Sequence, residues 1–315
     1  MTWKNIFRRT FSTLFIVAIM IFAVGCGNNP NADNKNSPQN EAVDDAEKNY
    51  SPEQKLAKAD ELFNAGEYNH ALKLYDDVIK LNPNPATYVQ RGKTYFGLKQ
   101  YENTIFDCDA ALELNSDYID AYLNRGKAYF GLEQYENAIS DFDKVFELSH
   151  DNAEAYLNRG KTLFALEEYD SAIDDYNSAI EINPDYAEAY NNRGLAYTAL
   201  WQDDQAIEDY EKAISLKEDY AEAYNNLGVT YNLLKQADDA IAAFDKAIEL
   251  NPNYAEAYNN RGEAYSSTWQ EFRAIQDYDK AIELDPDYEK AYVNKNKAYA
   301  NIVAYEQLLG GFGGY

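Results

Sequence analysis

The chain has 315 residues, a formal net charge of −26 at pH 7 and a sequence pI near 4.3. Such an acidic surface repels phosphate groups, which argues against nucleic acid and anionic lipid headgroups as partners. Only two cysteines are present, so side-chain packing rather than a disulfide framework has to stabilise the fold.

The start of the chain differs in composition from the rest. Basic residues precede an apolar run at residues 14–24, which is followed by Gly25 and Cys26. This order is typical of a secretory signal. The ending AVGC resembles the cleavage box of bacterial lipoproteins, which implies that residues 1–25 are a signal peptide and that Cys26 is lipidated. The alternative is an uncleaved membrane anchor, although the run is short for a span of about 20 residues.

Both interpretations predict an exported chain that is held at the bacterial cell envelope, by the outer membrane or the outer face of the plasma membrane. Residues 27–50 are rich in Asn, Asp, Pro and Ser and have almost no apolar content. Such a segment cannot bury enough surface to fold, so we expect residues 26–50 to form a lipidated, disordered tether. If Cys26 is lipidated, Cys108 has no disulfide partner, and we expect it to be a buried thiol.

A 34-residue period extends over about residues 52–302. Glycines recur at this spacing, and we call such a set of equivalent positions, one in each repeat, a column. The glycine column is Gly92, Gly126, Gly160, Gly194, Gly228 and Gly262. A fixed period of this length is typical of a helical solenoid. Tyr190, Gly194 and Tyr197 also fall at i, i+4 and i+7, which places them on one face of a helix.

One period resembles the tetratricopeptide repeat family, on the pattern Tyr156, Gly160, Tyr169, Ala172, Tyr176, Ala179 and Pro184. The resemblance implies an all-α fold, a right-handed superhelical solenoid of helix–turn–helix repeats. About seven repeats and a capping helix are then expected over residues 51–302. Residues 303–315 are expected to hold the end of the cap and a flexible Gly-rich tail. The first helix of each repeat is expected to line a concave groove.

Residues that carry chemistry are scarce. The two histidines, His70 and His150, stand in different repeats, and the sequence has no HExxH, GxSxG, Walker or CxxC motif. We therefore predict no enzymatic activity, no cofactor, no metal and no small-molecule substrate. Acidic pairs such as Asp174–Asp175 are interpreted as solvated helix faces, or otherwise as weak cation sites.

In each first helix, the face that points away from the tyrosines and glycine described above is a candidate binding surface. At about 100° per residue from Tyr122, Asn124 lies near 200°. The matching asparagine column is Asn124, Asn158, Asn192, Asn226, Asn260 and Asn294. An amide both donates and accepts hydrogen bonds, so we predict that this column binds the backbone of an extended peptide. The alternative is that these amides hold adjacent helices together.

Two further columns, one of lysines and one of phenylalanines, distinguish the N-terminal half of the expected groove from its C-terminal half. The first repeats carry a cation and an aromatic ring: Lys93, Lys127 and Lys161, with Phe96, Phe130 and Phe164. Neutral or acidic residues replace them later in the chain. We predict that residues 85–165 dock an apolar segment bearing acidic groups, and that residues 187–267 hold extended backbone. The alternative is that the lysines solvate a helix face.

One column consists of arginines, and the column 16 residues later consists of aspartates. Both columns are interrupted in the same repeat, where Leu227 replaces the arginine and Ala243 replaces the aspartate. The residues that pair by this spacing are Arg91 with Asp107, Arg125 with Asp141, Arg159 with Asp175, Arg193 with Asp209, and Arg261 with Asp277. An antiparallel hairpin brings the two positions together, so we predict an ion pair in each of these repeats. An apolar contact is expected at Leu227–Ala243.

These features predict an envelope-anchored scaffold or adaptor that binds a protein or extended peptide in its groove and contacts the membrane only through a lipid. The alternative function is a non-catalytic recruiting or regulatory subunit of a cell-envelope enzyme complex, in glycan or peptidoglycan metabolism.

Overall fold

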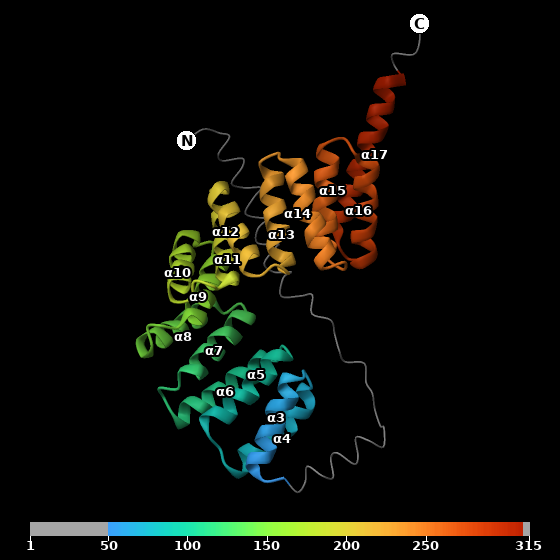
Figure 1. Ribbon diagram of the computed structural model, residues 1–315. Helices are drawn as coiled ribbons and strands as arrows, with labels where there is room; N and C mark the ends of the chain where they lie inside the picture. The colour runs from blue at the N-terminus through green and yellow to red at the C-terminus, as the bar shows by residue number, and fades with distance from the viewer. Residues whose placement is uncertain (1–49, 311–315) are drawn as a thin grey trace, which may run out of the picture. The chain divides into compact units, whose positions relative to one another are not determined.

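The computed structural model of the protein describes residues 50–310, with side chains to residue 307. The predicted signal peptide, Cys26, nearly all of the tether and residues 311–315 lie outside this range. The described residues form 15 α-helices and no strands, so the predicted all-α fold is confirmed (Figure 1). Among these residues no helix is long and apolar enough to cross a membrane.

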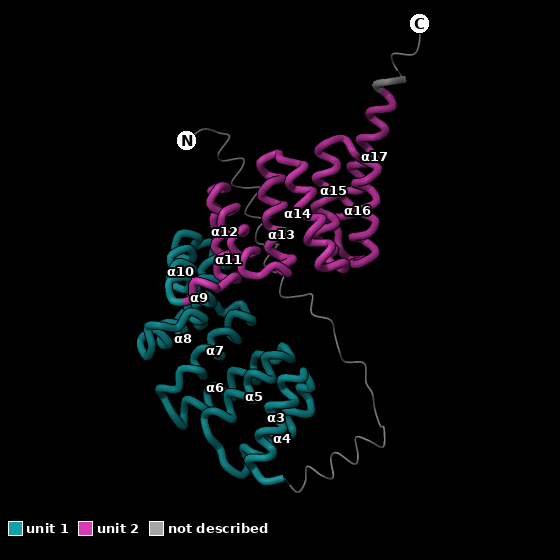
Figure 2. The backbone as a smooth tube through the Cα atoms, viewed as in Figure 1, with its two compact units in different colours: residues 1–182 teal, residues 183–315 magenta. Residues whose placement is uncertain are grey.

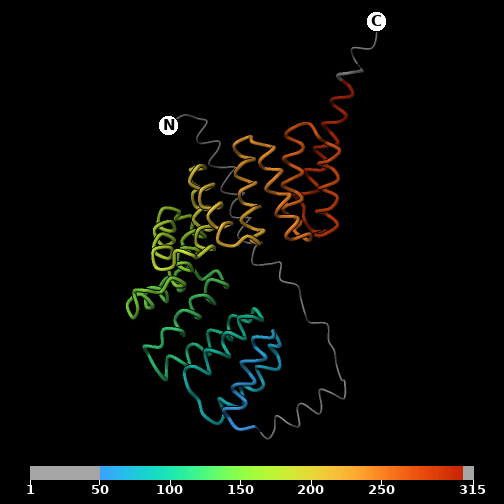
Figure 3. The backbone as a smooth tube through the Cα atoms, viewed as in Figure 1, coloured from blue at the N-terminus to red at the C-terminus, as the bar shows by residue number. Residues whose placement is uncertain are grey.

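The chain forms two compact units, residues 1–182 and 183–315 (Figure 2). Unit 1 consists of helical hairpins that follow one another in chain order (Figure 3). The hairpins are α3 (Pro52–Asn64) with α4 (Tyr68–Leu81), α5 (Pro85–Gly97) with α6 (Tyr101–Leu114), α7 (Ile119–Gly131) with α8 (Tyr135–Leu148), and α9 (Ala153–Ala165) with α10 (Tyr169–Ile182).

Unit 2 repeats this arrangement and ends in a single long helix. Its hairpins are α11 (Ala187–Ala199) with α12 (Asp203–Leu216), α13 (Ala221–Leu233) with α14 (Ala237–Leu250), and α15 (Ala255–Ser267) with α16 (Glu271–Leu284), followed by α17 (Glu289–Gly310). In both units each second helix packs against the first helix of the next hairpin, and successive first helices also contact one another.

The turn inside each hairpin is fixed by a left-handed residue. In the second hairpin Lys99 has a φ of 58°, and its N–H donates to Phe96 O at 2.8 Å. The next N–H, from Gln100, donates to Tyr95 O at 2.9 Å. These two bonds satisfy carbonyls at the end of α5 that have no partner within the helix. The same position is left-handed at Glu133, Glu167, Trp201, Lys235 and Trp269.

The glycine column is explained by an aromatic ring on the second helix. A Cβ on Gly160 would lie 2.6 Å from Cε1 of Tyr176, a buried side chain. Helix α5 is the exception, because Cys108 stands where the ring would be. A Cβ on Gly92 would meet nothing nearer than the Asp107 Cβ at 3.4 Å. The Cys108 side chain is 0% exposed, which confirms the expected buried thiol, and burial raises its pKa.

The last helix extends further than the repeat pattern implies. The first helices of the inner hairpins end just before their left-handed residue, and the same position in α17 is Val303. A β-branched residue strongly disfavours positive φ, so the helix continues instead of turning. Figure 1 shows the C-terminal part of α17 extending past α15 and α16.

Candidate functional site

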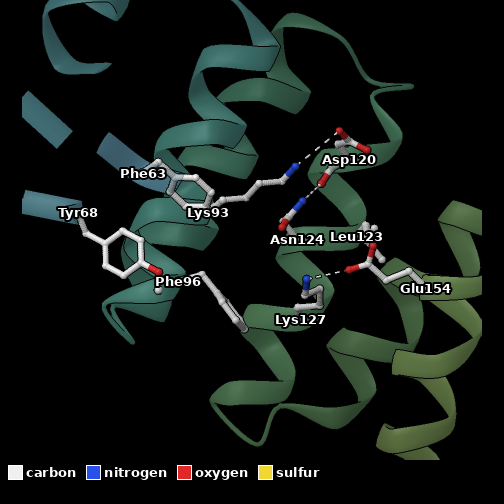
Figure 4. Close-up of a pocket in the computed structure, with 10 residues that line it drawn as sticks. Phe63, Tyr68, Lys93, Phe96, Asp120, Leu123, Asn124, Lys127 and Glu154 are labelled. Carbon is white, nitrogen blue, oxygen red and sulfur yellow. Dashed lines mark hydrogen bonds and ion pairs between the residues drawn. The ribbon is translucent and has the colours of Figure 1, made fainter. Parts of the chain in front are cut away.

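An open cavity of about 400 Å³ lies on the first-helix face of unit 1 (Figure 4). Its lining comes from consecutive hairpins: Phe63, Tyr68, Lys93, Phe96, Gly97, Asp120, Leu123, Asn124, Lys127 and Glu154. Four of these, Lys93, Phe96, Asn124 and Lys127, are residues that the sequence predicted as binding residues. The structure therefore brings these four predicted residues together at one place, and leaves Lys161, Phe130 and Phe164 of the same predicted region outside it.

Aromatic rings form one wall of the cavity. The Phe63 and Tyr68 ring centroids lie 5.7 Å apart, and the Phe96 ring lies 5.3 Å from that of Tyr101. A Cβ on Gly97 would lie 2.9 Å from Cζ of Tyr68. The absence of a side chain at Gly97 thus lets the Tyr68 ring of the preceding hairpin lie against the end of α5.

The opposite wall is charged, and its lysines face acidic residues of the next hairpin (Figure 4). Lys127 Nζ lies 2.9 Å from Glu154 Oε1 and 5.6 Å from the Phe96 ring centroid. Lys93 Nζ lies 3.9 Å from Asp120 Oδ2, which is beyond hydrogen-bonding distance. Lys93 can therefore donate to a ligand, whereas Lys127 is already engaged. Lys161 does not line the cavity.

The acidic partners of the lysines were missed by the sequence analysis, although the sequence carries a signal for them. Each acidic partner follows its lysine by 27 residues, as in Lys127 and Glu154. The same spacing joins Glu263 to Lys290 in unit 2, with the charges exchanged and Oε1 3.1 Å from Nζ. The lysine column is thus half of an inter-repeat ion-pair pattern, with one reversed copy.

The asparagine column differs from its expected orientation. In unit 1 the amide nitrogen of Asn124 donates to Asp120 O at 2.7 Å, and that of Asn158 donates to Glu154 O at 2.7 Å. Asn124 is 5% exposed, so only part of its amide reaches the cavity it lines. Each of these bonds runs along its own helix and uses one of the two N–H donors of the amide, which leaves the second donor and the amide oxygen for other contacts.

In unit 2 the asparagines are enclosed between first helices. The column members are only 2–8% exposed: Asn192, Asn226, Asn260 and Asn294. Three donate to the preceding first helix, from Asn226 to Asn191, from Asn260 to Asn225 and from Asn294 to Asn259, at 3.0–3.1 Å. The expectation that the asparagine column points away from packed surface was wrong in unit 2. A projection of one helix places residues around its own axis and does not include the neighbouring first helix, which covers this face. The role left open as the alternative, holding adjacent helices, is the one these contacts serve.

The aromatic column also divides. Phe130 packs in the core cluster around Phe142, and Phe164 is 1% exposed. The Phe164 ring meets Tyr169 edge-on at 5.2 Å. Only Phe96 of this column lines the cavity, so the expectation that Phe164 faces an open groove was wrong.

The five predicted Arg–Asp pairs are all two-point contacts across their hairpins. Arginine Nε lies 2.7–2.9 Å from one carboxylate oxygen, and Nη2 lies 2.5–2.8 Å from the other. In four hairpins Nη1 also meets an acidic residue of the preceding second helix, for example Arg261 with Asp245 at 2.6 Å. Burial raises the pKa of each paired aspartate, although its arginine acts in the opposite direction. These residues build the scaffold and take no part in the cavity.

The described part of the chain contains no cluster of three or more His, Cys, Asp or Glu side chains that could hold a metal ion. The cavity offers ring faces, one incompletely paired cation and two acidic groups.

Sequence-family models of this kind of repeat match much of the chain. A model described as "Tetratricopeptide repeat" matches residues 119–152 and 221–254, and others match 85–118 and 243–276. A further model, "TPR repeat", matches residues 160–200 and 202–235.

Solved structures show the same fold. A chain of the APC/C hetero-tetramer Cut9–Hcn1 is 19% identical with a TM-score of 0.68, over 76% of this chain and 48% of that chain. This chain therefore spans about half the length of that relative. A tetratricopeptide repeat protein from Parabacteroides merdae is 19% identical with a TM-score of 0.63, over 79% and 98% of the two chains. Pseudomonas aeruginosa pilF is 17% identical with a TM-score of 0.60, over 68% and 97%. The solved structures show the shared fold, and the repeat models, which together match more than half of the chain, show that this chain belongs to the tetratricopeptide repeat family.

Proposed function

We propose that this protein is a non-catalytic scaffold or adaptor that binds an extended segment of a partner protein in the cavity of unit 1. The observation that carries the proposal is the meeting of Phe96, Lys93 and Lys127, from successive first helices, on one open cavity. Stacked helical repeats present such extended surfaces to protein partners.

The chemistry of the cavity indicates the kind of segment it accepts. The rings of Phe63, Tyr68 and Phe96 suit an apolar or aromatic side chain of the partner. Lys93 suits a carboxylate next to that side chain, because its ammonium group makes no hydrogen bond of its own to Asp120. Asn124 is the one member of the asparagine column on this cavity, and we propose it for the peptide-backbone contact.

Capture of the partner from solubilised membranes tests the proposal. Phe96→Ala and Lys93→Ala should each lower the captured amount about tenfold, and the effect of Lys93→Ala should shrink in high salt. Phe106→Ala is the matched control, because this ring is 68% exposed on α6 and lies outside the cavity. Equal capture by all variants would contradict the proposal, provided that their urea midpoints agree.

We also propose that the protein is exported and held at the cell envelope by a lipid on Cys26. The basic start, the apolar run and the AVGC ending support this proposal. Cys26→Ser should move the protein from the membrane to the soluble fraction, and continued membrane association would contradict it. The identity of the captured partner decides the alternative function: a glycan- or peptidoglycan-acting enzyme would make this chain its recruiting or regulatory subunit.

A further inference from the structure

Helix α17 carries an uncovered stripe at a position that is covered in every inner hairpin. In α15, Gly262 lies against the ring of Tyr278 on the second helix α16, and Tyr265 packs against the core cluster that contains Tyr278. The residues one period later are Asn296 and Tyr299 of α17. With Tyr292 and Val303 they form the open stripe, four residues within about 60° of one another on the helix.

No helix covers the open stripe within the described residues. Tyr292, Tyr299 and Val303 are 43%, 49% and 51% exposed. Val303 stands where the inner hairpins turn, and the chain continues through it as α-helix to Gly310 instead of folding back. Large exposed side chains gathered on one helix face mark an interaction surface.

Lys295 lies beside the open stripe and indicates that a segment covering the stripe would carry an acidic side chain. It stands in the arginine column, where Arg261 binds both Asp245 and Asp277. Lys295 Nζ lies 2.5 Å from Asp279, the counterpart of Asp245. The counterpart of Asp277 is Gly311, which has no carboxylate. Within the described residues Lys295 therefore has one acidic contact, where Arg261 has two.

Asn296 indicates the shape of the covering segment. At the same position in α15, a Cβ on Gly262 would lie only 2.6 Å from the Tyr278 ring. A helix with a ring at that place therefore cannot approach Asn296 as closely as α16 approaches α15. A small side chain is required there, as Cys108 shows opposite Gly92.

We propose that the open stripe binds an amphipathic helix of another protein, with a carboxylate for Lys295 followed directly by a small residue facing Asn296. A second copy of this chain is a poor occupant. In the described residues the second helices that carry the Arg-paired aspartate bury it in their own hairpins, at 0–8% side-chain exposure. The full chain also carries a net charge of −26, which opposes self-association.

A designed peptide tests this inference on the full chain in detergent. The probe has the sequence of residues 270–285, the α16 segment, with Tyr278→Ala, and binding is followed by fluorescence anisotropy. Tyr299→Glu in the protein should weaken binding at least tenfold. Val293→Glu is the matched control, since Val293 is 50% exposed on α17 but lies about 100° from Tyr292. Asp277→Asn in the peptide should weaken binding to the protein, but not to its Lys295→Met variant.

A comparison of two peptides on the protein and on its Asn296→Gly variant tests whether side-chain size at this contact decides binding. The unaltered peptide, with its ring at 278, should bind the protein less tightly than the Tyr278→Ala peptide, and Asn296→Gly should reverse this order. Equal binding to the Tyr299→Glu and Val293→Glu variants, no binding of either peptide, or a preference of the protein for the unaltered peptide would each overturn the inference. So would a dimer in sedimentation analysis that Tyr299→Glu abolishes, because the occupant would then be a second copy.

Discussion

Arg193 and Asp209 form a two-point ion pair across one hairpin, with Nε–Oδ2 and Nη2–Oδ1 distances of 2.7 and 2.6 Å. In the next hairpin Leu227 and Ala243 occupy the same two positions, and both are buried. Because both members are exchanged together, the apolar hairpin contains no buried carboxylate without a partner. The scaffold therefore accepts either a charged pair or two buried apolar residues at this place, provided that both positions change together.

Arg193→Leu alone should lower the free energy of unfolding by about 3–5 kcal/mol, because Asp209 is left as a buried, unpaired charge. The double variant Arg193→Leu with Asp209→Ala should cost less than Arg193→Leu alone. Urea denaturation of the wild type, both single variants and the double variant closes the cycle. Costs that simply add would show that the two residues do not interact.

Gly160→Ala and Gly92→Ala should have different effects although both are glycines of the same column. The new Cβ at 160 meets the buried Tyr176 ring at 2.6 Å, so we expect a cost of about 1–3 kcal/mol from overpacking. At 92 the nearest atom is 3.4 Å away, and alanine favours the helix by up to about 1 kcal/mol. Thermal unfolding should place Gly92→Ala at or above the wild type and Gly160→Ala well below it. The reverse order would contradict the role given to the ring.

Lys127→Glu should destabilise unit 1 by no more than about 1 kcal/mol, because the ion pair with Glu154 is partly exposed. Adding Glu154→Lys should restore stability, since the protein already uses the reversed order at Glu263–Lys290. Urea midpoints in low and high salt measure both effects, which should shrink as salt screens the charges. A double variant that is less stable than Lys127→Glu alone would contradict the pairing.

Glu256 should make unit 2 less stable as pH rises above the ordinary range of a carboxyl group. Burial, and to a smaller extent the Glu222 carboxylate, raise its pKa, while Lys290 acts in the opposite direction. A carboxyl whose pKa is higher in the folded state contributes stability below its unfolded pKa of about 4.3 and loses it as pH rises through the folded pKa. Glu256→Gln should flatten this decline in urea titrations across that pH range. An unchanged slope would show that another group is responsible.

The fold and the Arg–Asp pairs could be predicted because equivalent positions of the repeats can be compared with one another within a single sequence. The period located the hairpins, and the joint gap at Leu227 and Ala243 paired two columns that lie 16 residues apart. A contact within one hairpin has a fixed spacing, so the sequence is sufficient to identify it.

The binding surface was predicted less well because contacts between hairpins decide which side chains stay open. Asn226 lies on the face expected to be free, yet the preceding first helix covers it and accepts its hydrogen bond through Asn191. Phe96 and Phe164 share a column but not an environment, since Phe96 reaches the cavity and Phe164 is buried. Such differences depend on how neighbouring helices pack, which a pattern along one helix does not contain.

Site-specific photo-crosslinking in intact cells tests most directly whether the unit 1 cavity binds a partner. A photoreactive phenylalanine analogue is placed at position 96 in one variant and at position 106 in the other, and adducts are mapped by mass spectrometry. We expect position 96 to give one dominant adduct, on a partner segment with an apolar side chain next to an acidic one, and position 106 to give none of it. The same adducts at both positions, or none at position 96, would contradict the account.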